Sequence, residues 1–201
     1  MTKNLVCAIT GHRVQAFFAY QNTMPDIIEK TGELIKEVIA TLYSKGVKTF
    51  LTGGACGIDL WFAHEVMIFR KTHPDCRSVM CIPFECQDRF WPEETRKEYR
   101  YAKDHADMVI YIDHDPPSTY KFHKRNQYMV NHADVLVGFK FESILTGGTQ
   151  SCLNYAEKKH VVVLTVDPSQ PQKGLVYLER IKLFENIKKI PLPVKENSEI
   201  L

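Results

Sequence analysis

Residues 49–59 read TFLTGGACGID, a short apolar strand that runs through a glycine-rich turn into the start of a helix. The rest of the chain also alternates short β-branched runs with longer amphipathic ones, which is typical of βαβ units around a parallel sheet. The predicted strands are Leu5–Thr10, Thr49–Thr52, Ser78–Pro83, Met108–Asp113, Asp134–Phe139 and Val161–Val166. The sequence therefore predicts an α/β fold: a doubly wound, mainly parallel sheet with helices on both faces.

Helical spacing of apolar residues fills several stretches between these strands. The clearest helix begins at Pro25, a residue suited to a first helical turn, and ends at Gly46. Further helices are predicted over Ile58–Arg70, Glu93–Ala106 and Gln150–Lys159. The helix Glu93–Ala106 is very polar, so we expect it on the surface.

The end of the chain differs from the part before it. Pro168 and Pro171 interrupt regular structure after Asp167, so we predict one domain over residues 1–167 and a C-terminal tail over residues 168–201. Four apolar residues of the tail fit one face of a basic amphipathic helix: Leu178, Ile181, Phe184 and Ile187. Such a helix would pack on the domain or on a partner subunit, so a homo-oligomer is one alternative.

Composition limits the classes of function. With 201 residues, 44% of them apolar, the chain can build one α/β domain around its own core. The sequence has 26 Lys and Arg and 24 Asp and Glu, so its net charge is only +2, which argues against nucleic acid as a partner.

No apolar run approaches the roughly 18 residues of a membrane helix, and the first residues lack the apolar core of a signal peptide. We expect a cytoplasmic protein without a membrane partner.

Three of the cysteines are regularly spaced along the sequence. Cys76, Cys81 and Cys86 recur every five residues near His73, which raises the alternative of a zinc site. The paired Cys-x-x-Cys spacing of structural zinc sites is missing, so buried reduced thiols are favoured. We therefore expect no metal and no cofactor.

Three glycine-containing turns follow predicted strands: Thr10-Gly11-His12-Arg13, Gly53-Gly54-Ala55-Cys56-Gly57 and Gly147-Gly148-Thr149. The carboxyl ends of parallel strands meet at one edge of a sheet, where backbone N–H groups and helix N-termini can bind phosphate or ribose. The alternative is that the glycines serve only the geometry of the turns. We favour a binding site because all three turns fall at the same edge.

Polar residues in these turns have two interpretations each. Asp59, in the first turn of its predicted helix, can complement the helix dipole or accept ribose hydroxyls. Thr149 can be an N-cap or a phosphate contact. Arg13 can be solvated or can bind an anion.

Arg125 interrupts an otherwise apolar stripe if residues 118–129 form a helix. Its guanidinium then needs a partner, which is either Asp113 or Asp134 in an ion pair, or a bound phosphate or carboxylate; we favour the anion. The neighbouring Asn126 can hydrogen-bond a base or sugar or cap a turn. Trp91 can stack on a base or pack in the core.

Together these motifs resemble the SLOG superfamily of Rossmann-like proteins, most closely its YpsA-like branch. The resemblance covers about Leu5–Val166 and also includes Gln87, Met129 and Ala133-Asp134. It implies a nucleotide-derived ligand at the strand ends. The expected ligand-binding residues are Thr10, Gly11, Arg13, Gly53, Gly54, Gly57, Asp59, Trp91, Arg125, Asn126, Gly147, Gly148 and Thr149.

The superfamily also implies two alternative functions. LOG phosphoribohydrolases carry an Arg-Lys motif and a Gly-Gly-x-Gly-Thr-x-x-Glu motif with catalytic Arg and Glu; here Arg125 matches the Arg, Asn126 replaces the Lys and Cys152 replaces the Glu. A thiol cannot serve as the same acid, so hydrolysis of nucleoside monophosphates is the first alternative rather than the expectation. DprA-like binding of single-stranded DNA, with a basic patch of Lys121, Lys124 and Arg125, is the second. We expect a nucleotide-binding sensor or adaptor, and the sequence leaves open whether it is an enzyme.

Overall fold

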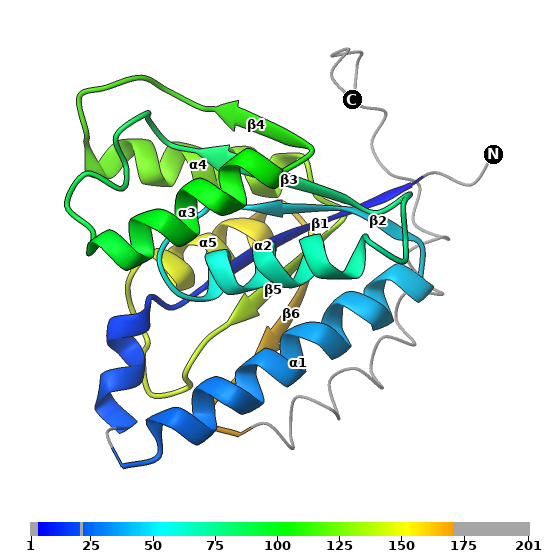
Figure 1. Ribbon diagram of the computed structural model, residues 1–201, viewed down its shortest axis with the longest axis horizontal. Coiled ribbons are helices and arrows are strands. Elements are labelled where there is room, and N and C mark those ends of the chain that lie inside the picture. The colour runs from blue at the N-terminus through cyan, green and yellow to red at the C-terminus, as the bar shows by residue number, and fades with distance from the viewer. Residues whose placement is uncertain (1–3, 21, 171–201) are drawn as a thin grey trace.

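The computed structural model describes residues 4–20 and 22–170 (Figure 1). Within them, one six-stranded sheet has the order β4-β3-β2-β1-β5-β6, and every neighbouring pair is parallel. The strands are β1 (Leu5–Gly11), β2 (Val47–Thr52), β3 (Arg77–Ile82), β4 (Met108–Tyr111), β5 (Val135–Phe139) and β6 (Val162–Val166). The predicted α/β, Rossmann-like, doubly wound fold is confirmed.

The helices cover the two faces of the sheet in separate groups. They are α1 (Met24–Ser44), α2 (Ile58–Phe69), α3 (Glu93–His105), α4 (Thr119–Asn131) and α5 (Gly148–Lys158). Helices α1 to α3 lie on the near face in Figure 1, whereas α4 and α5 pack together behind the sheet. Successive residues of β2 enter the two cores, Phe50 on one face and Leu51 on the other.

A short helix before α1 was not predicted. It is the 3₁₀ helix η1 (Val14–Tyr20), which buries Phe17 completely. The ring of Phe17 meets Trp61 of α2 edge-on at 5.2 Å and Phe141 at 4.9 Å between ring centroids. A 3₁₀ segment this short has no repeating apolar pattern, so only its tertiary contacts reveal it.

Element ends differ slightly from the prediction. For example, β4 ends at Tyr111 instead of Asp113, because its partner strand β3 ends at Ile82, which pairs with Tyr111. No helix in the described ranges is long and apolar enough to cross a bilayer. The predicted helix containing Leu178 and Phe184 lies outside the described residues, so the two-part division of the chain and the homo-oligomer stay predictions.

The strand order places a switch point in the middle of the sheet. Strand β1 pairs with β2 on one side and with β5 on the other. The chain leaves β1 towards helices on one face and leaves β5 towards α5 on the other. Ligands of doubly wound sheets bind outside the carboxyl ends of the strands at such a point. The glycine turns expected to bind a ligand lie at this edge.

Candidate functional site

The turns after β1 and β2 are packed directly against each other. The N–H of Ile58 donates to the carbonyl oxygen of His12 over 3.4 Å, and the N–H of His12 donates to the carbonyl oxygen of Phe139 over 3.1 Å. A Cβ added to Gly11 would lie 2.5 Å from the Ile58 side chain, and one added to Gly57 would lie 2.9 Å from the His12 carbonyl oxygen. These two glycines are therefore needed for close packing between the turns.

Gln87 supports the Gly53-Gly54 turn from the loop after β3. Its buried side-chain amide donates to the carbonyl oxygens of Gly53, at 3.5 Å, and Gly54, at 3.4 Å. The sequence included Gln87 in the family resemblance but not among the expected site residues. Its signal was a polar side chain in the loop after a buried strand, although its partners could not be deduced from that position.

Arg125 and Asp59 form the buried centre of the site. Arg125 of α4 is 6% exposed and Asp59 of α2 is 5% exposed. Nη1 of Arg125 lies 3.6 Å from Oδ2 of Asp59, which is an ion pair without a hydrogen bond. Within the described part of the chain, Nε and Nη1 of Arg125 have no hydrogen-bond partner. A guanidinium with buried, unused donors is suited to binding an anion.

The partner of Arg125 differs from both carboxylates considered in the sequence. Asp113 is paired with Lys124 at 2.7 Å and with Lys121 at 3.3 Å. Asp134 accepts the backbone N–H of Val6 at 2.9 Å. The alternative that Arg125 pairs with Asp113 or Asp134 was therefore wrong, because α4 directs this side chain towards Asp59 in the first turn of α2.

The surroundings of the pair affect its protonation. Burial raises the pKa of Asp59 above that of an ordinary aspartate, although Arg125 and the N–H of Ala55 partly oppose this effect. Cys152 of α5 is buried beside Arg125, Asp59 and Thr10, and its burial raises the pKa of the thiol to about 11. At neutral pH Cys152 is thus a protonated thiol, which carries no negative charge and is a far weaker acid than the glutamate of the hydrolase motif.

The N-terminus of α5 brings a third turn to the site. Gly147 is the N-cap, with a φ of 100° that favours glycine, and Gly148 is the first helical residue. Thr149 is buried in the first turn of α5. The interpretation of Thr149 as the N-cap was therefore wrong, because Gly147 has that position. A Cβ added to Gly148 would meet no atom within 4 Å. This turn therefore leaves room for a ligand beside the first N–H groups of a helix.

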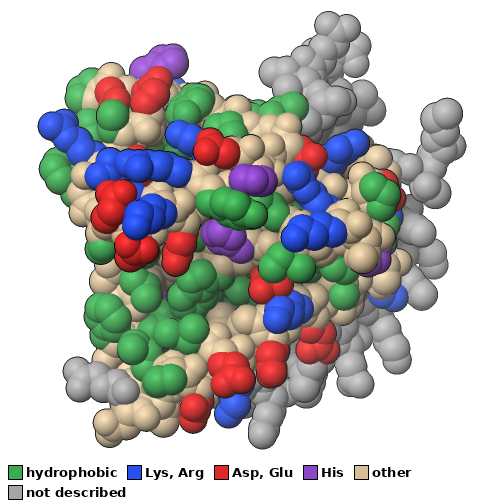
Figure 2. All heavy atoms as spheres, viewed as in Figure 1, with side chains coloured by type: hydrophobic (Ala, Val, Ile, Leu, Met, Phe, Trp, Pro, Cys, Tyr) green, Lys and Arg blue, Asp and Glu red, His purple; other side chains and the backbone are tan. Residues whose placement is uncertain are grey.

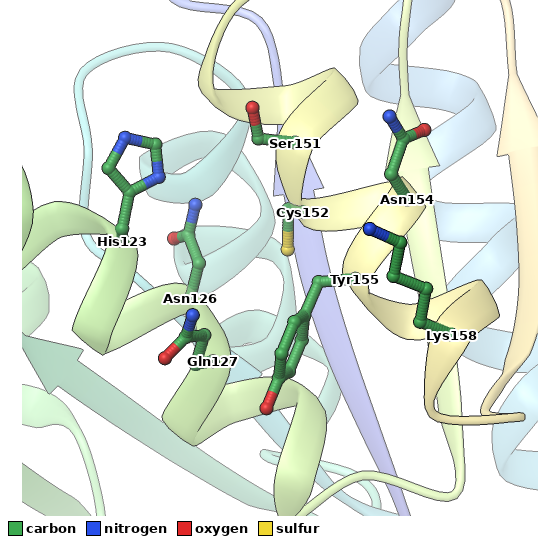
Figure 3. A pocket seen from close by; sticks show the side chains of 8 residues that line it. All are labelled: His123, Asn126, Gln127, Ser151, Cys152, Asn154, Tyr155 and Lys158. Carbon is green, nitrogen blue, oxygen red and sulfur yellow. The ribbon is translucent and has the colours of Figure 1, made fainter.

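Three other predicted residues lie around this centre. Arg13 is exposed, and its guanidinium carbon lies 5.6 Å from the centre of the Phe122 ring. Trp91 packs edge-on against Tyr99 of α3, with ring centroids 5.4 Å apart. Asn126 lines a groove between α4 and α5 instead of the Arg125 cluster (Figure 3). The structure therefore separates Asn126 from its sequence neighbour.

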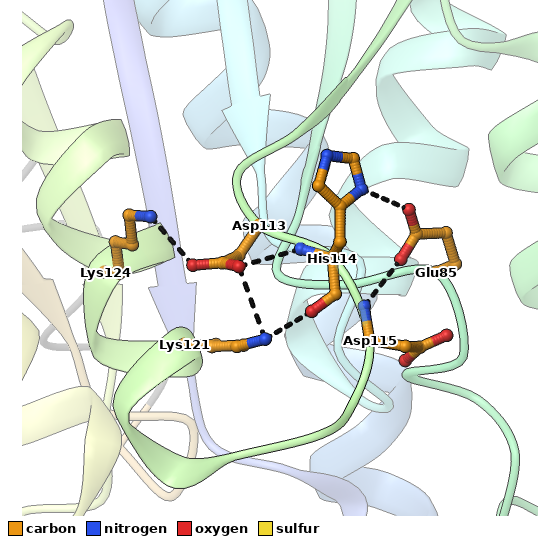
Figure 4. A network of polar contacts seen from close by, with 6 residues as sticks. All are labelled: Glu85, Asp113, His114, Asp115, Lys121 and Lys124. Atoms are coloured by element: carbon orange, nitrogen blue, oxygen red, sulfur yellow. Dashed lines mark hydrogen bonds and ion pairs between the residues drawn. The ribbon is translucent and has the colours of Figure 1, made fainter.

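A network of charged groups fixes the loop between β4 and α4 (Figure 4). Asp113 accepts from Lys124 and Lys121, and these hydrogen bonds hold the pKa of its carboxyl far below the ordinary value. Glu85, after β3, contacts the His114 ring at 2.6 Å and accepts the backbone N–H of Asp115 at 3.0 Å. The lysines predicted to form a basic patch are therefore largely engaged in holding α4.

The His114 titration should report this network. Its hydrogen bond with Glu85 raises the pKa of His114, so we expect NMR titration to give a value above that of an ordinary histidine. Glu85→Gln should lower it, whereas Glu94→Gln, which changes an exposed carboxylate on α3, should not. A raised histidine pKa means that the contact stabilises the fold below the ordinary pKa and loses this effect as pH rises through the raised value. An unchanged pKa in Glu85→Gln would show that the contact is absent in solution.

The cysteines considered for zinc are dispersed. Cys76 and Cys81 are buried in the two different cores, whereas Cys86 is exposed. Among the residues that the structure describes, no three His, Cys, Asp or Glu side chains are placed to hold a metal ion.

Relatives of this chain include bacterial proteins without a described activity. The uncharacterized SPbeta prophage-derived protein YoqJ of Bacillus subtilis is 30% identical over 150 residues, which cover 69% of this chain and 85% of YoqJ. The UPF0398 protein BH1768 of Halalkalibacterium halodurans is 30% identical over 135 residues, which cover 66% of this chain and 70% of that protein.

Solved structures share the fold at low sequence identity. DNA processing protein A from Helicobacter pylori, described by its unique single-stranded DNA binding mode, has a TM-score of 0.55 at 18% identity over 92% of this chain and 81% of that one. DNA processing protein A (DprA) from Streptococcus pneumoniae has a TM-score of 0.52 at 15% identity over 88% of this chain, but only 56% of that chain is covered.

These structures correct one expectation. The small net charge was taken to argue against a nucleic-acid partner, but that inference was wrong because a protein described as binding single-stranded DNA has the same fold. Net charge sums the whole surface, whereas binding depends on the local groups around one site.

The model of the YspA SLOG family matches residues 7–170, so the chain belongs to this family.

Proposed function

We propose that this protein binds a nucleotide-class ligand through its phosphate at the carboxyl edge of the sheet and acts as a sensor or adaptor. The observation that carries the proposal is the buried guanidinium of Arg125, whose Nε and Nη1 lack hydrogen-bond partners in the described residues. Family membership and the fold shared with DNA processing protein A support nucleotide- or DNA-related binding.

The phosphate would be held by two kinds of donor. The first is the Arg125 guanidinium, which can donate two parallel hydrogen bonds to one anion. The second is the set of free N–H groups at the start of α5, where Gly148 leaves the backbone open. Asp59 would hold Arg125 and keep one carboxylate oxygen near a ribose. Cys152 is a much weaker acid than a glutamate, because burial raises the pKa of its thiol, and this favours binding without hydrolysis.

Replacing Gly148 with Ala tests this proposal without disturbing the fold. The added methyl meets no protein atom within 4 Å, but it would stand where the phosphate approaches the backbone. We expect Gly148→Ala to weaken binding of AMP and ribose 5-phosphate by about tenfold or more, a loss of about 1.4 kcal/mol, in titration calorimetry. Gly32→Ala in α1 also adds a methyl in open space and should leave binding unchanged. Equal binding by both variants, or none by the parent, would contradict a phosphate site here.

Single-stranded DNA is a second candidate because aromatic rings are exposed at the same edge. Phe90, in the loop after β3, is 85% exposed with Arg89 near its ring, and Tyr120 in the first turn of α4 is 70% exposed. Figure 2 shows hydrophobic side chains gathered over η1 on one face of the molecule, and charges of both signs mixed over α3. Exposed rings beside cations can stack successive bases. The same titrations with a short oligodeoxythymidylate distinguish the two functions. Binding of the oligonucleotide but not of AMP would indicate single-stranded DNA as the ligand.

A further inference from the structure

A groove separates α4 from α5 next to the Arg125 cluster (Figure 3). Its volume of about 310 Å³ is at the lower end of the range of about 300–1,000 Å³ that is typical of ligand pockets. His123, Asn126 and Gln127 line it from α4, and residues from Ser151 to Lys158 line it from α5. The α5 side of the groove begins at Ser151, about one helical turn after the Gly147-Gly148 turn that is proposed to hold the phosphate.

Most polar groups that line the groove both donate and accept hydrogen bonds, whereas Lys158 only donates. Three carboxamides, those of Asn126, Gln127 and Asn154, face it from the two helices, and the described residues lining it include no Asp or Glu. Asn154 is already oriented, because its Oδ1 accepts from Gln150 over 2.7 Å, which leaves the Asn154 NH₂ as a donor. Such a set matches a planar heterocycle that has a donor next to an acceptor.

One wall of the groove is fixed and aromatic. The hydroxyl of Tyr155 donates to Oδ1 of Asn131 over 3.1 Å, which ties α5 to the end of α4 and holds the phenol ring in place. Because this hydrogen bond restricts the ring, less side-chain entropy is lost when a flat group packs on its apolar surface.

The groove and the anion site share a residue. Cys152 lines the groove, and it is also close enough to Arg125 and Asp59 for their charges to affect its thiol. A molecule with its phosphate at Arg125 and the α5 N-terminus could thus extend a flat group past Cys152 into the groove.

We propose that the α4–α5 groove binds the heterocyclic base of the nucleotide and that its carboxamides select adenine over cytosine. This inference rests on the proposed function. Asn and Gln form paired hydrogen bonds with N6 and N7 of adenine, whereas the amino group of cytosine is recognised by a carboxylate. The carboxamides present and the absence of Asp and Glu among the described lining residues both favour adenine.

The test replaces Asn126 and compares ligands that carry different parts of a nucleotide. We expect the parent protein to bind adenosine more tightly than cytidine, and Asn126→Ala to weaken adenosine binding by about tenfold, as loss of one paired contact would. Binding of ribose 5-phosphate, which has no base, should not change. Asn22→Ala is the matched control, because Asn22 is exposed in the turn before α1 and does not line the groove.

The outcomes separate this inference from the proposed function. If ribose 5-phosphate binds and depends on Gly148 while adenosine binds no better than cytidine or is unaffected by Asn126→Ala, the groove is not the base site and the phosphate site stands. If ribose 5-phosphate does not bind but adenosine binding depends on Asn126, the groove is the base site and the phosphate site is wrong. If Asn126→Ala weakens both compounds equally, it acts on the fold, and the groove proposal is overturned.

Discussion

Replacing Arg125 with Met should abolish binding of phosphate compounds and lower the free energy of unfolding by about 3–5 kcal/mol. The reason is that Asp59 would remain buried without the charge that faces it at 3.6 Å. Titration of ribose 5-phosphate measures the first effect, and urea unfolding followed by circular dichroism measures the second. Lys97→Met is the control, because Lys97 pairs with Glu94 on the exposed face of α3 and its loss should change little.

A double variant separates the two roles of the pair. Replacing a buried ion pair with apolar residues of similar size is often neutral for stability. Arg125→Met combined with Asp59→Leu should therefore recover most of the stability lost in the single variant, but it should still bind no ribose 5-phosphate. If the double variant binds as the parent does, Arg125 is only a structural partner of Asp59.

The pH dependence of the single variant follows from the pKa of Asp59. Burial already raises this pKa in the parent, and loss of Arg125 removes the main group that opposes the rise. A carboxyl whose pKa is higher in the folded state binds protons more readily there than in the unfolded chain, so folding is favoured as pH falls. We expect the stability deficit of Arg125→Met to shrink as pH falls from 7 through the raised pKa. A constant deficit would mean that Asp59 is not the residue left unpaired.

The sequence predicted the scaffold because the scaffold depends on local patterns. The β-branched runs around Phe50 and Val137 form parallel strands, and the apolar spacing of α1 places Ile35 and Leu42 in the core. The glycine turns lie at one edge as expected, because parallel strands end on the same side. A residue such as Phe17 was missed because its short helix forms by packing against distant side chains.

The site was less predictable because its contacts join distant segments. The apolar stripe on residues 118–129, which Arg125 interrupts, indicated correctly that Arg125 is buried. No local pattern indicates which carboxylate the Arg125 side chain will meet. Asp113 was nearer in sequence, yet Asp59 on α2 is the partner. The roles of Gln87 and of the groove beside Cys152 likewise depend on how the loop after β3 and the helices pack.

Gly53→Ala should produce the second large effect, because the guanidinium of Arg125 occupies the space where a side chain would stand. A Cβ at this position would overlap Arg125 and would lie 2.7 Å from Oδ2 of Asp59. Forcing a methyl group into such a packed place costs about 1–3 kcal/mol of stability. The displaced guanidinium would also leave the anion site, so we expect binding of ribose 5-phosphate to fall by at least about tenfold.

The cause of this loss can be checked by removing the group that is displaced. In the Arg125→Met, Asp59→Leu background, Gly53→Ala should cost less stability than in the parent, since residues in contact give non-additive effects. Gly32→Ala, whose added methyl meets no atom within 4 Å, should have the same effect on stability in both backgrounds. If Gly53→Ala costs the same in both, the methyl group acts on the backbone turn, and the close approach of Arg125 to Gly53 is not the reason for a glycine at this position.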